Sequence, residues 1–190
     1  MYLLTAPTAE PVTLAEAKVG ARVDAGDTAL DDLITGYIQA ARQMAEQITG
    51  QRYMQCTLRW EDDDWPDDED DIIPAWRPTT VAVTYWTGST WATLSSGDYA
   101  HYVCGHGTAL APAVGTWWPA LGLAPGESPR VRVDLTVGVT DAALVPATVK
   151  TYIKACISHW INNPDAAPRG NTQPSPLFER LLDGEKLLWL

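Results

Sequence analysis

The stretch Glu61 to Asp71, EDDDWPDDEDD, is the first candidate for a chemical site because nine of its eleven residues are acidic. Carboxylate oxygens are the ligands that calcium and magnesium prefer. Calcium loops, however, place their ligands at fixed offsets around a glycine, and this stretch has neither a glycine nor the D-x-D-x-D-G order. A block of like charges repels itself and stays in water. We therefore predict a solvated loop between two strands that binds no metal, with these carboxylates in solvent: Asp62, Asp63, Asp64, Asp67, Asp68, Asp70 and Asp71.

The second candidate is the pattern H-x-x-C-x-H formed by His101, Cys104 and His106. On a strand, residues 101 and 104 point to opposite faces, so the three side chains do not converge unless the strand breaks at Gly105. The pattern also supplies three ligands with no obvious fourth. We interpret these residues as structural ones at a strand end.

The third candidate is the pair Cys156 and His159, which a nucleophilic mechanism would need to face a cleft. Both residues lie on or beside an apolar stripe, so we expect them to line helix packing. The sequence contains no G-x-S-x-G, Walker or G-x-G-x-x-G pattern. We predict neither an enzyme nor a cofactor.

Composition narrows the class of protein further. The chain has 190 residues and a formal net charge of -11, which argues against binding to phosphate backbones. Three widely spaced cysteines predict reduced thiols rather than a disulfide framework or a zinc site. No signal peptide and no membrane span are expected. Nine tryptophans against one phenylalanine suit either a sheet core or interfaces.

Two helical patterns bracket the middle of the chain. Thr13 and Glu16 form a capping box that begins a short helix, expected to end near Val19. A second helix should start at Asp27 or Thr28 and end at Gly50, with an apolar stripe of Leu30, Leu33, Ile34, Tyr37, Ile38, Ala41, Ala45 and Ile48. Pro146 opens a third helix, whose stripe consists of Val149, Tyr152, Ile153, Cys156, Ile157, Trp160 and Ile161.

Between these helices the period changes to two. Met54, Cys56, Leu58 and Trp60 alternate with polar residues, and so do Val131, Val133, Leu135 and Val137. The predicted fold class is α+β: an amphipathic helical core with an inserted antiparallel β module and an extended C-terminal arm. The predicted parts are N-terminal helices at 1–50, the β insertion at 51–140, a core helix at 141–163 and a linker with a docking arm at 164–190.

The tail combines a breaker-rich linker with an apolar end. The segment DAAPRGNTQPSP is not expected to form regular structure, and leucine-rich residues follow it. These residues either fold back onto the core or bind a partner. We favour docking, on a portal or on a neighbouring subunit, by Leu177, Phe178, Leu181, Leu182, Leu187, Leu188, Trp189 and Leu190.

The order of several segments resembles one known family. The segments are EPVTLAEAK, DDLITGYIQAARQMAEQITGQ, IIPAWRPTTVAVTYW, GTWWPA, VRVDLTVGVTD and VPATVKTYIKACISHW. In this order, from about Glu10 to Trp160, they resemble the head-tail connector, or adaptor, proteins of long-tailed bacteriophages and gene transfer particles. The acidic stretch is longer and more acidic than the loop expected there.

The resemblance implies a structural virion protein. Such adaptors form a ring, usually of twelve copies, between the portal and the stopper or tail-completion proteins, and DNA passes through without specific binding. The implied location is the head-tail junction of a virion assembled in the cytoplasm of a bacterial host, where the acidic loop could face the channel. Two alternatives from other classes stay open: a monomeric acidic binding module such as a DNA-mimic inhibitor, and a metal-dependent hydrolase that uses the acidic run.

Overall fold

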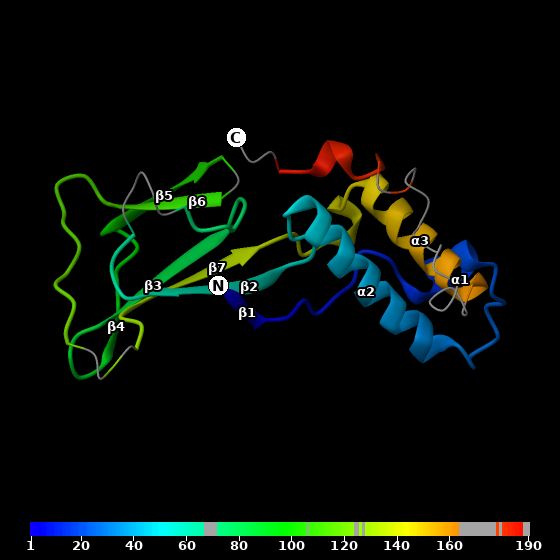
Figure 1. Cartoon of the computed structure of the whole chain (residues 1–190), viewed down its shortest axis with the longest axis horizontal. Helices are drawn as coiled ribbons and strands as arrows, with labels where there is room; N and C mark the ends of the chain where they lie inside the picture. The colour runs from blue at the N-terminus through cyan, green and yellow to red at the C-terminus, as the bar shows by residue number, and fades with distance from the viewer. Residues whose placement is uncertain are drawn as a thin grey trace. The chain divides into compact units, whose positions relative to one another are not determined.

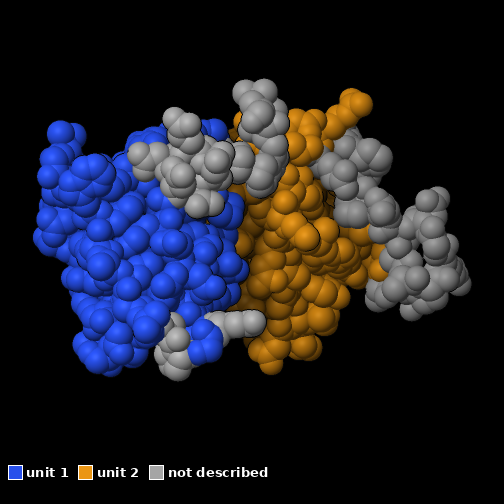
Figure 2. Space-filling view, turned by 60° about the vertical axis from the view of Figure 1, so that its left-hand side comes forward, with its two compact units in different colours: residues 1–7, 55–138, 188–190 blue, residues 8–54, 139–187 orange. Residues whose placement is uncertain are grey.

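The computed structural model describes residues 1–66, 72–105, 107–123, 126, 128–163, 178 and 180–187. These residues form two compact units, coloured separately in Figure 2. Unit 1 takes in Met1–Pro7 and Gln55–Gly138, and unit 2 takes in Thr8–Met54 and Val139–Leu187. The predicted fold class, α+β, is confirmed, because the helices belong to unit 2 and the antiparallel sheets to unit 1.

Helix α1, Leu14–Ala21, begins at the predicted capping box. The Thr13 hydroxyl accepts a hydrogen bond from the Glu16 backbone N–H at 3.2 Å, and the Glu16 carboxylate accepts one from the Thr13 N–H at 2.8 Å. These reciprocal bonds satisfy backbone donors that the first turn leaves unpaired. The hydrogen bond from the Thr13 backbone also holds the pKa of Glu16 below its usual value.

The two long helices pack on each other as their stripes require. Helix α2 is Asp31–Thr49 and helix α3 is Ala147–Asn162 (Figure 1). One hydrophobic cluster takes the buried residues of α2, Ile34, Ile38, Ala41 and Ala45, together with those of α3, Val149, Tyr152, Ile153, Cys156 and Ile157. Leu33, which the stripe included, is 46% exposed.

Helix α2 starts three to four residues later than predicted because the preceding loop has its own hydrogen bonds. The carboxylates of Asp24 and Asp27 accept from the backbone N–H groups of Gly26 and Ala29, at 2.7 and 3.0 Å. Lys18 is buried and donates from Nζ to the Asp27 carbonyl at 2.8 Å, and it also pairs with Asp31. Asx turns of this kind compete with helix, so α2 begins only after them.

A buried ion network joins the C-terminal half of α2 to the chain segments before and after the helix. Arg42 donates from Nε to Glu10 at 2.7 Å and from Nη1 to Glu46 at 3.1 Å. Glu46 also accepts from Arg52 at 2.9 Å and from the Tyr53 N–H at 3.3 Å. Burial alone would lower the pKa of Arg42, but its bonds to the two carboxylates raise it. The guanidinium therefore stays charged. The cost of burying these charged side chains is offset because each of them has an oppositely charged partner.

Unit 1 is built on a five-stranded antiparallel sheet. Its strand order is β1-β2-β7-β3-β4, in which β1 is Tyr2–Thr5, β2 is Cys56–Asp62, β7 is Val131–Val137, β3 is Thr80–Trp86 and β4 is Trp91–Thr93. Strand β7 is central, and its alternating residues Val131, Val133, Leu135 and Val137 are buried as predicted.

The other face of the sheet is polar and ion-paired. Arg59 on β2 lies directly opposite Asp134 on β7 and donates to both of its carboxylate oxygens, at 2.6 and 2.7 Å. Arg132 on β7 pairs with the opposite Glu61 at 2.7 Å, and its guanidinium lies 3.8 Å from the ring centroid of Trp91. Opposite charges at facing positions stabilise the register of the sheet.

A second sheet consists of β5, Tyr99–Cys104, and β6, Gly107–Pro112. Strand β6 is tied to the segment after the acidic stretch, because Ile73 and Thr108 exchange backbone hydrogen bonds of 3.0 and 2.9 Å. Gly107 lies so close to this segment that an added Cβ would be 2.2 Å from the Ile73 carbonyl oxygen. Only glycine permits that approach.

Two boundaries differ from the predicted parts. Residues 1–7, expected with the N-terminal helices, belong to unit 1, because β1 pairs with β2. Met54, expected to begin the β insertion, is buried in the helical cluster of unit 2. A side chain at a junction joins whichever core can bury it, and local periodicity does not contain that information.

The helical cluster generates a stability prediction. Ile38→Ala and Ile157→Ala should each lower the free energy of unfolding by roughly 2 to 5 kcal/mol, because each leaves a cavity in a packed core. Urea denaturation followed by circular dichroism measures the change. Leu33→Ala, on the exposed side of the same helix, is the control and should cost less than about 1 kcal/mol. Losses below about 0.5 kcal/mol at both isoleucines would contradict this core.

Candidate interaction surfaces

The acidic stretch is partly strand and partly solvated. Glu61 and Asp62 are the last two residues of β2. Asp62 and the two residues that follow it, Asp63 and Asp64, are exposed. Asp67, Asp68, Asp70 and Asp71 lie outside the described residues. Among the residues that the structure describes, no group of three His, Cys, Asp or Glu side chains could hold a metal ion.

The histidine and cysteine candidates do not form a described site. His101 is exposed on β5, Cys104 is half-buried at its end, and His106 lies outside the described residues. Cys156 is fully buried in the helical cluster, where a substrate could not reach it, and His159 is half-buried near the end of α3. No helix in the described part of the chain is long and apolar enough to cross a bilayer.

The most conspicuous surface of unit 1 is the segment 113–123, which we call the apolar loop. It joins β6 to the approach to β7 and carries no charged residue. The Trp118 ring stacks on Trp65 with centroids 4.6 Å apart and planes inclined by 4°, and the Trp65 indole N–H donates to the Pro119 carbonyl at 2.8 Å. Trp65, in the middle of the acidic stretch, therefore anchors this loop.

The far end of the apolar loop is fixed to β3. The Gly122 N–H donates to the Trp86 carbonyl at 2.9 Å, and the Trp86 indole N–H donates to the Leu123 carbonyl at 3.1 Å. An added Cβ at Gly122 would lie 2.0 Å from the Gly88 nitrogen. A glycine is required at this close approach.

Anchoring on one side leaves apolar side chains in solvent on the other. Trp117 is 90% exposed although its neighbour Trp118 is stacked, and Val114 and Leu123 are exposed to a similar degree. A loop that is fixed in place and exposes large apolar side chains is typical of an interaction surface. The sequence signal was present, because an uncharged segment with two tryptophans stands out in an acidic chain, but GTWWPA was considered only as one of the segments that resemble the adaptor family.

Strand β1 is a second apolar surface that the sequence reading missed. Tyr2, Leu3 and Leu4 are each 42 to 50% exposed, and β1 lies at an edge of the sheet. The short run YLLT between Met1 and Pro7 was the available signal, since apolar and aromatic residues favour strands.

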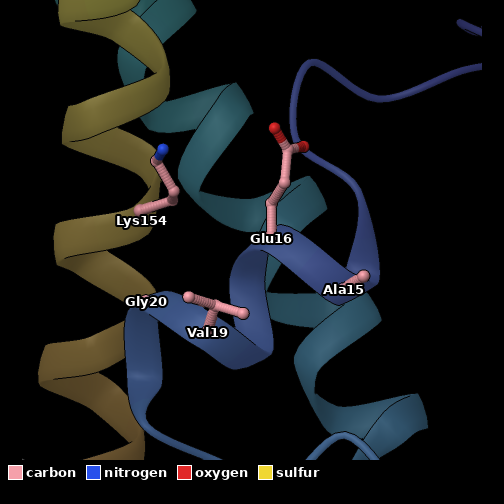
Figure 3. Close-up of a pocket in the computed structure, with 5 residues that line it drawn as sticks. All are labelled: Ala15, Glu16, Val19, Gly20 and Lys154. Atoms are coloured by element: carbon pink, nitrogen blue, oxygen red, sulfur yellow. The ribbon is translucent and has the colours of Figure 1, made fainter.

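Unit 2 carries an open groove of about 450 Å³ between α1 and α3 (Figure 3). Ala15, Glu16, Val19, Gly20 and Lys154 line it. Gly20 lets the helices approach, because its Cβ position is 3.4 Å from Lys154 Cβ. Glu16 is engaged in the capping box with Thr13, and the hydrogen bond from the Thr13 backbone lowers its pKa.

The described residues of the predicted docking arm lie on unit 2. Leu182 is fully buried in the helical cluster, and Phe178 and Leu181 pack against it. The Leu187 N–H donates to the Thr49 carbonyl at 2.9 Å, and its side chain lies 3.6 Å from the Cβ position of Gly50. In this conformation Leu182 belongs to its own core rather than to a partner, which differs from the expected docking role. Leu177, Leu188, Trp189 and Leu190 lie outside the described residues.

Comparisons with known proteins identify a shared fold. No family model matches the sequence, and no curated protein matches it. A chain in the neck of an empty gene transfer agent (GTA) particle, computed with C6 symmetry, is 17% identical with a TM-score of 0.76, covering 100% of this chain and 97% of that chain. A chain in the virion of a native GTA particle is 14% identical with a TM-score of 0.72, covering 99% and 97%. A third, in the neck of the native particle computed with C12 symmetry, is 16% identical with a TM-score of 0.66 and the same coverage.

The two adjacent tryptophans of the apolar loop generate a prediction. Trp118→Ala should lower the free energy of unfolding of unit 1 by about 1 to 3 kcal/mol, because it removes a stacked, half-buried ring. Trp117→Ala is the matched control and should change it by less than about 0.5 kcal/mol. Chemical denaturation followed by near-ultraviolet circular dichroism distinguishes the two. Equal losses for both variants would show that the loop does not present Trp117 to solvent.

The described part of the acidic stretch generates another. Replacing Asp62, Asp63 and Asp64 with asparagine should leave the fold intact, because an amide oxygen can still accept the bonds from the Asp63 and Trp65 N–H groups. Thermal melting should not change when millimolar calcium or magnesium is added to the unsubstituted chain. A rise of several degrees that the substitutions abolish would instead identify a metal site.

Proposed function

We propose that this chain is a head-tail connector (adaptor) subunit: a structural, non-enzymatic virion protein that forms a ring at the neck of a phage-like particle. The single observation that carries this proposal is the structural similarity to neck chains, which extends over practically the whole length of this chain and of each neck chain. It includes the helical unit and the β unit together. The order of sequence segments independently resembles the adaptor family.

The proposed ring contains several identical copies, and twelve is the number that the family resemblance implies. The related neck structures were computed with C6 and C12 symmetry, which supports a ring. The proposed partners are the portal on one side and a stopper or tail-completion protein on the other. Assembly takes place in the host cytoplasm. A docking role for Leu177, Leu188, Trp189 and Leu190 stays a prediction of this proposal.

The charge of the chain is compatible with passage of DNA. A net charge of -11 disfavours binding to the phosphate backbone, so duplex can pass a ring of such subunits without being held. On the polar face of the sheet, Glu61 and Asp134 are neutralised by arginines. The exposed carboxylates of Asp62, Asp63 and Asp64 are among those available to repel DNA.

A deletion tests the proposal. Cells that make the particle without this chain should yield DNA-filled heads that lack tails, and the unsubstituted chain supplied in trans should restore tailed particles. Electron cryomicroscopy of the restored particles should show the chain as a ring at the neck. Tailed, infectious or gene-transferring particles in the deletion strain would refute the role. A chain that stays monomeric outside the particle and binds a basic nuclease would favour the DNA-mimic alternative.

A further inference from the structure

Unit 1 has two uncharged apolar surfaces, one at an edge of its main sheet and one beyond the ends of strands β2 and β3. One is the edge of β1, Tyr2–Thr5, and the other is the apolar loop, 113–123. Strand β1 is the first strand in the sheet order, whereas the apolar loop is anchored to Trp86 on β3, next to the last strand. Figure 1 shows the loop, in light green, at the end of unit 1 remote from β1.

The two leucines of strand β1 add little to the core of unit 1. Its partner in the described part of the chain is β2, which leaves its outer edge open. Leu3 and Leu4 are 50% and 42% exposed, and neither belongs to the hydrophobic cluster of unit 1. An open apolar edge is a template for a further segment of extended chain.

The apolar loop offers exposed apolar side chains that could cover the β1 edge. Its inner side is fixed by Trp65 and Trp86, and its outer side presents Val114, Trp117 and Leu123. Because these side chains are held before any partner arrives, little conformational freedom is lost when they bind. Exposed tryptophans in such positions are the common anchors of protein interfaces.

The net charge of the chain determines which kinds of partner its surface attracts or repels. A basic partner would be attracted to the acidic surface of this chain, but a second copy, with the same charge of -11, is repelled by it. Copies approach each other with less electrostatic repulsion through surfaces without charge than through acidic ones. The β1 edge and the apolar loop are two such surfaces, and neither contains an acidic or basic side chain.

We propose that the β1 edge of one copy receives the apolar loop of the next copy. Two different surfaces of the same chain form a head-to-tail contact, and repetition of that contact gives a ring when the rotation between neighbours closes. The proposal rests on the ring of the proposed function and names the surfaces that join its subunits. Trp117 is the anchor, and Leu3 and Leu4 are the residues that it covers.

Cysteine cross-linking in assembled particles tests the contact. The variant carries Leu3→Cys and Trp117→Cys, together with Cys104→Ser to remove the half-buried native thiol. The remaining cysteines, Cys56 and Cys156, are 3% and 0% exposed and will not react in the folded chain. A short bismaleimide should give a ladder of covalent multimers up to the full ring. Each single-cysteine variant should give no ladder.

A matched control replaces Leu3→Cys by Val103→Cys, because Val103 on β5 is 45% exposed and Leu3 is 50% exposed. Val103→Cys with Trp117→Cys should give no ladder. A ladder from the control, or none from the Leu3 variant in particles whose neck ring is visible, overturns this inference and leaves the proposed function intact. A cross-link from Leu3→Cys to the portal or tail chain also overturns it. Particles without the chain at the neck overturn both proposals.

A charge exchange gives a second readout. Leu3→Asp and Trp117→Asp should each reduce the recovery of tailed particles at least tenfold without lowering thermal stability, because both residues are exposed in the single chain. Leu3→Asp combined with Trp117→Lys should restore recovery at low salt, since opposite charges then meet across the contact. Normal recovery with both single aspartate variants would refute the contact.

Discussion

The burial of strand β7 between β2 and β3 is the interaction on which unit 1 depends. Val131, Val133, Leu135 and Val137 are almost completely buried, and burial of each such side chain contributes about 1.5 to 3 kcal/mol. The same strand aligns Arg132 and Asp134 with their partners on β2. Because β7 orders β2 and β3, it also positions Trp65, which follows β2, and Trp86, which ends β3, and these two residues hold the apolar loop.

The helical unit depends on paired burial of a different kind. The stripes of α2 and α3 share one cluster, and the buried Arg42 and Glu46 connect it to the chain segments before and after α2. A buried charge is tolerated only when it is paired, so these contacts specify one arrangement of the flanking chain. Burial likewise raises the pKa of Tyr53 to about 12 and keeps its hydroxyl neutral beside Thr49.

Exposed charged side chains and exposed apolar side chains lie on different segments of unit 1. Asp62, Asp63 and Asp64 are exposed to solvent, whereas Glu61 and Asp134 are paired with arginines. In unit 1, strand β1 and the apolar loop carry large exposed apolar side chains, and both segments are uncharged. Under the proposed function, a subunit that lets DNA pass and still binds its own copies benefits from this separation, because charge that repels DNA also repels an identical neighbour.

The sequence by itself determined the helices, the alternating strands β2 and β7 and the α+β class, because hydrophobic period and capping are local properties. Even there it misplaced the start of α2, since the Asx turns at Asp24 and Asp27 compete with helix. Only the tertiary structure decided that β1 joins a sheet built from residues more than fifty positions away, that Leu182 is buried, and that Trp118 is stacked while Trp117 is exposed. Neighbouring tryptophans are equivalent in a sequence pattern. Their difference arises because Trp65 and Trp86 hold the loop from one side, and such contacts between distant residues exist only once the chain has folded.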